Sequence, residues 1–134
     1  MTDQTGEPNV RAYLVTVTEV TALLGQRIYS QRAPDGSRGL YAVYQRSGRQ
    51  GESTFCAPDD LVGGDYQIDV YGRDDQEVGL AARAIRRAMV ETRVAQMGPV
   101  AVKKVFLVND FDSVDPDPGL VRRTQLYTIW YAEG

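Results

Sequence analysis

The sequence predicts a single α+β domain over residues 1–134, with an antiparallel or mixed sheet of about four to five strands and two main helices packed on one face. Three observations support this fold class. Two segments repeat apolar residues at helical spacing, and several others alternate apolar and polar residues as strands do. The strands also follow one another in neighbouring pairs, in the order αβββαββ, and 134 residues suffice for one self-supporting core.

Two segments have helical periodicity. In the first, Pro8 suits the opening turn, apolar residues recur every three or four positions as far as Leu24, and Gly25 is a natural terminator. Residues 1–7 are expected to be a flexible lead-in. The second segment, Asp74–Met97, begins with acidic residues that favour the positive end of a helix, and it ends before a Gly-Pro pair. Its predicted inner stripe is Leu80, Ala81, Ala84, Ile85, Ala88, Met89 and Thr92.

Five segments are expected to be strands. Four are rich in β-branched and aromatic residues, and the second in chain order follows a turn as the returning arm of a hairpin. They are Leu40–Arg46, Ser53–Ala57, Asp65–Tyr71, Val100–Val108 and Arg122–Tyr131. Residues 26–39 are expected to form a connector that turns at Pro34, with Ile28 and Tyr29 as a short extended or buried anchor. Residues 109–121 are expected to form a long acidic loop.

Alternation along each strand assigns its faces, because successive side chains point to opposite sides of a sheet. Tyr66, Ile68 and Val70 are expected to point into the core. On the strand Val100–Val108, the side chains of Val102, Phe106 and Val108 are expected to share one face. On the strand Arg122–Tyr131, the side chains of Leu126, Thr128 and Trp130 are expected to share one face. The predicted core includes both Ile68 and Trp130.

The composition argues against an enzyme. Histidine is absent, which removes the commonest general base and the commonest transition-metal ligand. The single cysteine, Cys56, has no histidine partner, and no glycine-rich phosphate-binding motif follows a strand. We therefore expect no catalytic residues, no cofactor and no metal site. A carboxylate-only enzyme pairing Asp69 with Glu91 is an alternative, although nothing in the sequence brings those two residues together.

Charge and hydropathy restrict the kinds of molecule and membrane with which this protein is expected to interact. The formal net charge of −3 argues against an autonomous DNA-binding protein, which needs a basic face to neutralise phosphates. Tyrosines on strands could stack bases, so a ligand- or nucleic-acid-binding module remains an alternative, but packing in the core and at interfaces is favoured. No run of about 18 apolar residues exists, so no membrane span is expected.

Two sets of charged residues are candidates for contacts with other subunits or partner proteins. The acidic loop concentrates four carboxylates, whose spacing does not complete a calcium-binding loop. Arginines stand where a neighbour could meet them, and a guanidinium is suited to bidentate contact with a carboxylate. The candidate contact residues are Arg32, Arg38, Arg46, Arg49, Asp110, Asp112, Asp115, Asp117, Arg122 and Arg123.

Several short motifs occur in the order found in one protein family. They are Gln26-Arg27-Ile28-Tyr29, Arg32-Ala33-Pro34, Leu40–Arg46, Gln67–Tyr71, Asp115–Leu120 and Thr128–Tyr131. In this order the chain resembles the small tail-completion proteins of long-tailed bacteriophages and prophages over most of residues 20–131. The family often has proline at the position of Leu40. This difference in the present sequence concerns turn geometry and leaves function untouched.

The resemblance implies a structural assembly protein with no catalytic residues. It implies a tail terminator or head-to-tail joining subunit, which caps the tail tube as a ring, commonly of six copies. Its partners would be itself, the tail tube protein and the head connector, while DNA passes through without specific binding. Its place would be the tail or neck of the virion, and the host cytoplasm during assembly. Another neck or minor tail protein remains the alternative within the particle.

Overall fold

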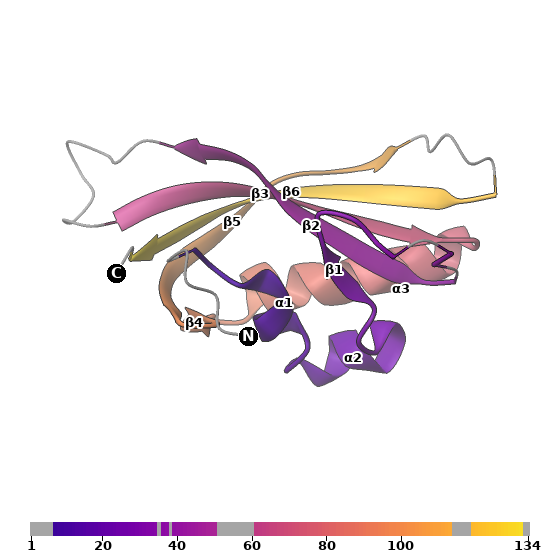
Figure 1. Ribbon diagram of the computed structural model, residues 1–134, viewed down its shortest axis with the longest axis horizontal. Helices are drawn as coiled ribbons and strands as arrows, with labels where there is room; N and C mark the ends of the chain where they lie inside the picture. The colour runs from indigo at the N-terminus through magenta and orange to yellow at the C-terminus, as the bar shows by residue number, and fades with distance from the viewer. Residues whose placement is uncertain (1–6, 35, 38, 51–60, 114–118, 133–134) are drawn as a thin grey trace.

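The computed structural model describes residues 7–34, 36–37, 39–50, 61–113 and 119–132. Six strands form one mixed sheet in the order β1-β2-β3-β6-β5-β4, in which only the β1–β2 pair is parallel. The strands are β1 Ile28–Ser30, β2 Tyr41–Gln50, β3 Leu61–Gly72, β4 Gln96–Met97, β5 Val100–Ser113 and β6 Val121–Ala132. Helices α1, α2 and α3 all lie on the same side of the twisted sheet (Figure 1).

The α+β class is confirmed, and two details of its prediction are wrong. The sheet has six strands instead of four to five, because Ile28–Ser30 of the expected connector and Gln96–Met97 of the expected helix both join it. The predicted first helix is two helices, α1 Val10–Leu14 and α2 Thr18–Leu24. The expected hairpin strand Ser53–Ala57 and residues 1–6 of the lead-in lie outside the described residues.

The first helix breaks at three consecutive β-branched residues, Val15, Thr16 and Val17. Such residues lose side-chain freedom in a helix, so they are a weak point in the pattern. The hydroxyl of Thr16 donates to the carbonyl of Tyr13 at 2.6 Å, and Val17 is extended with φ −92° and ψ 113°. The apolar period of 3.6 continues through the break, so the pattern alone predicted one helix.

The second helix ends six residues earlier than predicted. Helix α3 spans Asp75–Arg86, and the π-helical turn η1 continues it over Arg87–Glu91. Asp74 caps it by accepting a hydrogen bond from the backbone N–H of Gln76 at 3.1 Å. Beyond η1 the chain folds back, because Gly98 takes a positive φ of 64° and lets β4 pair with the start of β5.

The predicted inner stripe of α3 is correct at five positions and wrong at two. Ala81, Ala84, Ile85, Ala88 and Met89 are buried. Leu80 is 49% exposed, and Thr92 is exposed beyond the end of η1. Val78 and Ala82 are buried in their place, so the helix face is rotated from the predicted one.

Strand β5 is longer than predicted and takes up much of the expected acidic loop. Residues Asn109–Ser113 pair with β6, so the segment between the strands is 114–120 instead of 109–121. Register shifts between Val102 and Lys104, and between Leu107 and Asn109, mark two bulges. A bulge adds one residue and reverses the alternation beyond it.

The first bulge reverses the predicted faces of β5 beyond Val102. Val102 and Val105 are buried against the helices, whereas Phe106 is 48% exposed and Val108 is 63% exposed. The prediction that Val102, Phe106 and Val108 share one face is therefore wrong. On β3, by contrast, no shift occurs against β6, and Tyr66, Ile68 and Val70 are buried as predicted.

The core lies between the helices and the near face of the sheet. Strand β6 contributes Tyr127, Ile129 and Tyr131 to this core, and each of these residues is at most 1% exposed. Trp130 is only partly buried on the opposite face, so its assignment to the core is wrong. The core residues contributed by the helices and by β1 include Val10, Leu14, Val20, Leu24, Ile28, Val78, Ile85 and Met89.

Candidate subunit-contact surface

The structure separates the candidate contact residues into several groups. Arg32 lies in the exposed loop after β1, Arg46 and Arg49 lie on β2, and the other described members lie on β5 and β6. Arg38, Asp115 and Asp117 lie outside the described residues. The candidate set is therefore spread along both edges of the sheet and across its centre.

Two candidates pair with each other within the chain. Asp112 on β5 and Arg123 on β6 are register partners, and the guanidinium Nε donates to the carboxylate at 3.0 Å. The pair arises because β5 continues past its predicted end. Exposed pairs of this kind contribute about 0–1 kcal/mol. The Asp112 side chain is still 66% exposed and retains room for a second contact.

Asp110 belongs to a buried polar network between sheet and helix. The amide of Gln125 donates to the carbonyl of Ala82 at 2.9 Å and to the Asp110 carboxylate at 3.3 Å. The hydroxyl of Tyr127 donates to the Gln125 side-chain oxygen at 2.7 Å. Burial, and then the nearby Asp110 carboxylate, raise the pKa of Tyr127 far above its usual range. Asp110 is thus engaged inside the subunit.

Arg46 forms an ion pair with Glu7 beside a polar pocket of about 300 Å³. The pocket is also lined by Tyr44 and Tyr66. The Tyr66 hydroxyl is buried and has no hydrogen-bond partner among the residues that the structure describes. Burial is the main cause that raises the pKa of Tyr66, followed by the charge of Glu7.

Replacing Tyr66 with phenylalanine should leave the free energy of unfolding at pH 7 unchanged or raise it by up to about 1 kcal/mol, because the lost hydroxyl is unpartnered. In the wild type, stability due to the raised pKa is present below pH 10 and is lost as the pH rises above 10, where the unfolded tyrosine ionises. Y66F should therefore lose less stability between pH 9 and pH 11, as measured by urea unfolding.

Tyr127→Phe is the matched control. It also removes a buried tyrosine hydroxyl, but it breaks the hydrogen bond to Gln125, so it should destabilise the protein already at pH 7. A loss of more than about 1 kcal/mol in Y66F at pH 7 would show that the Tyr66 hydroxyl has a partner.

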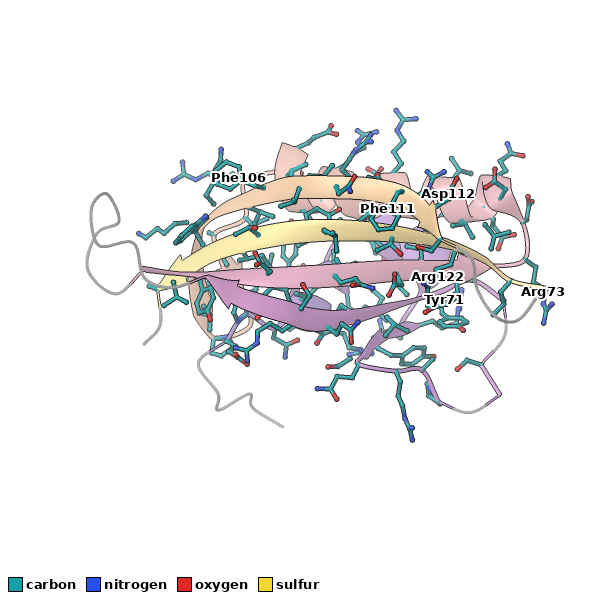
Figure 2. All side chains as sticks on the ribbon, turned by 90° about the horizontal axis from the view of Figure 1, so that it is seen from above. Tyr71, Arg73, Phe106, Phe111, Asp112 and Arg122 are labelled. Atoms are coloured by element: carbon teal, nitrogen blue, oxygen red, sulfur yellow. The ribbon has the colours of Figure 1, made fainter. Side chains whose placement is uncertain are left out.

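The other face of the sheet has no described helix on it, and we call it the helix-free face. Figure 2 looks onto this face, with Phe106 and Phe111 along β5 and Tyr71 and Arg122 across the neighbouring strands. Its centre is polar: the hydroxyl of Thr124 donates to Asp69 at 2.6 Å, and the hydroxyl of Thr128 donates to Asp65 at 2.8 Å. Such side-chain pairs tie β3 to β6 without a covering layer.

A row of aromatic residues crosses the helix-free face near one end. The rings of Tyr41 and Tyr71 stack with centroids 5.0 Å apart, and Tyr29 lies 6.3 Å from Tyr41. The guanidinium of Arg122 lies 5.9 Å from the centre of the Tyr71 ring. Beside this row is a groove of about 440 Å³, which we call the tyrosine groove. It is lined by Gln31, Arg32, Ala33, Pro34, Gly36, Ser37, Tyr41, Val43, Tyr71 and Leu120.

Exposed apolar side chains gather on β5, at the opposite edge of the same face. Phe106, Val108 and Phe111, the last 41% exposed, form what we call the β5 patch. The ammonium of Lys104 lies 5.6 Å from the centre of the Phe106 ring. Sequence reasoning missed this surface because it assigned Phe106 and Val108 without the two bulges, and it placed Phe111 in a loop.

The carboxylate-enzyme alternative finds no support in the geometry. Asp69 lies on the helix-free face, bonded to Thr124 and to the amide of Gln67. Glu91 ends η1 on the other side of the sheet and lies 3.7 Å from Arg86. Within the described ranges, no group of three acidic or cysteine side chains is placed to hold a metal ion. The helices of the described part are also too short or too polar to cross a membrane.

Comparisons with known proteins point to one family. The family described as "Tail completion protein gp17" matches residues 8–132. A chain solved within the "Virion of native gene transfer agent (GTA) particle" shares the fold with a TM-score of 0.76 at 15% identity, covering 92% of each chain. A second solved chain gives a TM-score of 0.51 at 16% identity, covering 90% of this chain and 92% of the other. No curated protein matches the sequence.

Proposed function

Because the chain belongs to the tail completion protein family and is thus a structural component of a phage tail, we propose that its copies close into a ring that caps the tail tube and joins it to the head connector. The family match over residues 8–132 carries this proposal. We expect six copies in the ring, because the resemblance to tail-completion proteins implies that number. Assembly would take place in the host cytoplasm, before the protein is incorporated in the virion.

A closed ring of identical subunits needs two unlike surfaces that meet head to tail. The sheet supplies such a pair on its helix-free face, the β5 patch at one edge and the tyrosine groove towards the other. The likeness to a chain from a gene transfer agent virion supports a place in a particle of this general type. The net charge of −3 suits a channel that lets DNA pass without holding it.

Deletion of the gene tests this role. We expect tails of uncontrolled length, or tails without heads, counted by negative-stain electron microscopy, and restoration by the gene in trans. Gold labelling of a tagged copy should mark the junction of tail and head. Labelling elsewhere in the tail would instead assign another minor tail position. Normal particles without the protein would contradict a role in completion and would leave a separate ligand- or nucleic-acid-binding module as the explanation.

Charged contacts are proposed to help align the subunits. Asp112 and Arg123 pair inside the chain, so contacts between subunits depend more on Arg32, Arg38 and the 114–118 segment with Asp115 and Asp117. The double change of Asp115 and Asp117 to asparagine should weaken ring formation several-fold in about 50 mM salt and much less in about 500 mM salt, because screening already reduces exposed charge contacts. Native mass spectrometry of the purified protein measures the ring population.

The matched control removes two carboxylates from the helix side, Asp75→Asn with Glu77→Gln. Both lie in the first turn of α3 and are exposed. This control changes the net charge by the same amount as the Asp115 and Asp117 double variant, but it should leave ring formation at the wild-type level. Equal weakening in both variants would mean that net charge, and not a local contact, drives the effect.

A further inference from the structure

The polar pocket of about 300 Å³ lies on the side of the sheet that carries the helices, and three separate segments of the chain line it. Arg46 of β2 and Tyr66 of β3 are register partners, so their side chains point to the same side of the sheet. Glu7 comes from the start of the described chain, and its carboxylate accepts a hydrogen bond from the guanidinium of Arg46. The ion pair of Glu7 and Arg46 is therefore part of the pocket wall.

The hydroxyl of Tyr66 is the unusual group of this pocket. Tyr66 is only 3% exposed, and its hydroxyl has no hydrogen-bond partner among the described residues. Besides burial, which is the main cause of the raised pKa of Tyr66, the charges of Glu7 and Arg46 act on this hydroxyl, so it lies close to their ion pair. A buried hydroxyl without a partner lowers stability, and proteins keep such costs chiefly where a function needs the group.

The backbone at the edge of the pocket is also in an unfavourable conformation. Gln31 has a φ of 70°, and it is the one non-glycine residue in the described ranges with a positive φ. Its backbone N–H donates to the carbonyl of Tyr44 at 2.7 Å, which holds this conformation, and both residues line the pocket. Strained backbone of this kind gathers at ligand sites. This is a second feature that stability alone does not explain.

The pocket is rich in hydrogen-bond donors. A guanidinium carries five N–H groups and no acceptor, and the raised pKa of Tyr66 keeps its hydroxyl protonated as a donor. The side-chain amides of Gln31 and Gln45 add further N–H groups to the lining. A carboxylate can accept from a guanidinium and from a hydroxyl at once, and such charge-assisted hydrogen bonds are the strong ones. The pocket volume lies at the small end of the range for ligand sites, which suits a short acid.

We propose that this pocket binds a carboxylate group, which takes the place of Glu7 on Arg46 and accepts the hydrogen bond that Tyr66 has free. Glu7 is then an internal competitor, which keeps Arg46 paired in the free subunit. The carboxylate belongs to a small organic acid or to an acidic side chain of another protein chain. This proposal is independent of the proposed ring.

Titration with propionate, followed by NMR of the ¹⁵N-labelled protein, tests the site. In the variant Glu7→Gln the competitor is removed, so we expect the Kd for propionate to fall by about tenfold relative to wild type. The shifts should centre on the amides of Gln31 and Arg46. The matched control is Glu19→Gln, which breaks the exposed ion pair with Arg87 away from the pocket and should leave the Kd at the wild-type value.

The donors are tested in the Glu7→Gln background. Adding Arg46→Gln should raise the Kd for propionate by about tenfold or more, because the charged partner is lost. Adding Tyr66→Phe should raise it several-fold without lowering the thermal midpoint. Propionamide, which has the same shape without the charge, should not bind. Equal Kd values for propionate in wild type and E7Q, or equal binding of propionamide, would overturn the proposal.

A peptide separates the two sources of the carboxylate. Acetyl-Ala-Asp-Ala-amide presents one carboxylate on a polypeptide chain. If it binds E7Q at least as tightly as propionate does, the pocket accepts an acidic side chain of another protein. If propionate binds and the peptide does not, the ligand is a small acid. Absence of binding by both, in a variant whose spectrum shows a folded protein, would overturn the site.

Discussion

Replacing Ile68 with alanine should lower the free energy of unfolding by about 2–5 kcal/mol. Ile68 lies at the centre of β3, is fully buried, and faces the helices from the middle of the core. Truncation removes three carbons and leaves a cavity that a sheet paired on both sides of β3 cannot close. Chemical denaturation at pH 7 measures the loss.

Leu80→Ala is the control for this experiment. Leu80 was predicted in the core but is 49% exposed on α3, so its truncation should cost about 0.5 kcal/mol or less. Equal losses in the two variants would mean that the helix faces are assigned wrongly. Trp130, also predicted in the core, is partly exposed on the helix-free face, and its replacement by alanine should fall between the two.

Replacing Gln125 with leucine should cost about 2–4 kcal/mol, although leucine is similar in size and apolar. The change leaves the Tyr127 hydroxyl buried without its acceptor, and it removes the amide that bonds to the Ala82 carbonyl and the Asp110 carboxylate. A buried polar group without a partner costs more than a hydrogen bond contributes, so the loss exceeds the value of the bonds themselves.

A double-mutant cycle with Tyr127→Phe separates these causes. The double variant Q125L/Y127F no longer buries an unsatisfied hydroxyl, so it should recover about 1 kcal/mol relative to the sum of the single losses. Additive losses would show that Tyr127 finds another partner once Gln125 is gone. Circular dichroism checks that all three variants remain folded at 25 °C.

Local patterns were reliable where each residue's neighbours in the chain decided its environment. The alternation of Tyr66, Ile68 and Val70 predicted the buried face of β3, and the acidic residues from Asp74 predicted the start of a helix, which Asp74 caps. The order of short motifs pointed to the family that the comparison then matched over residues 8–132. None of these conclusions requires knowledge of which strands lie side by side.

The surroundings of the candidate contact residues depend on long-range strand pairing, which local patterns do not predict. Asp112 was expected in a loop facing a neighbour, and it instead pairs with Arg123 because β5 continues along β6. Arg38, Asp115 and Asp117 remain candidates outside the described residues. The groove between Tyr41 and Tyr71 joins two strands that are 30 positions apart in the chain, and no local pattern predicts it.

By itself, the sequence determined the α+β class and the inner face of β3, because these follow from spacing and composition along the chain. It also indicated the family, through the resemblance of its ordered motifs. Only the tertiary structure decided which side chains of β5 are exposed. The first bulge, set by pairing with β6, turns Phe106 and Val108 away from the helices, and the continuation of β5 along β6 places Phe111 on the same face. A shift of one residue in register moves a side chain to the opposite face, and that shift depends on a partner strand distant in sequence.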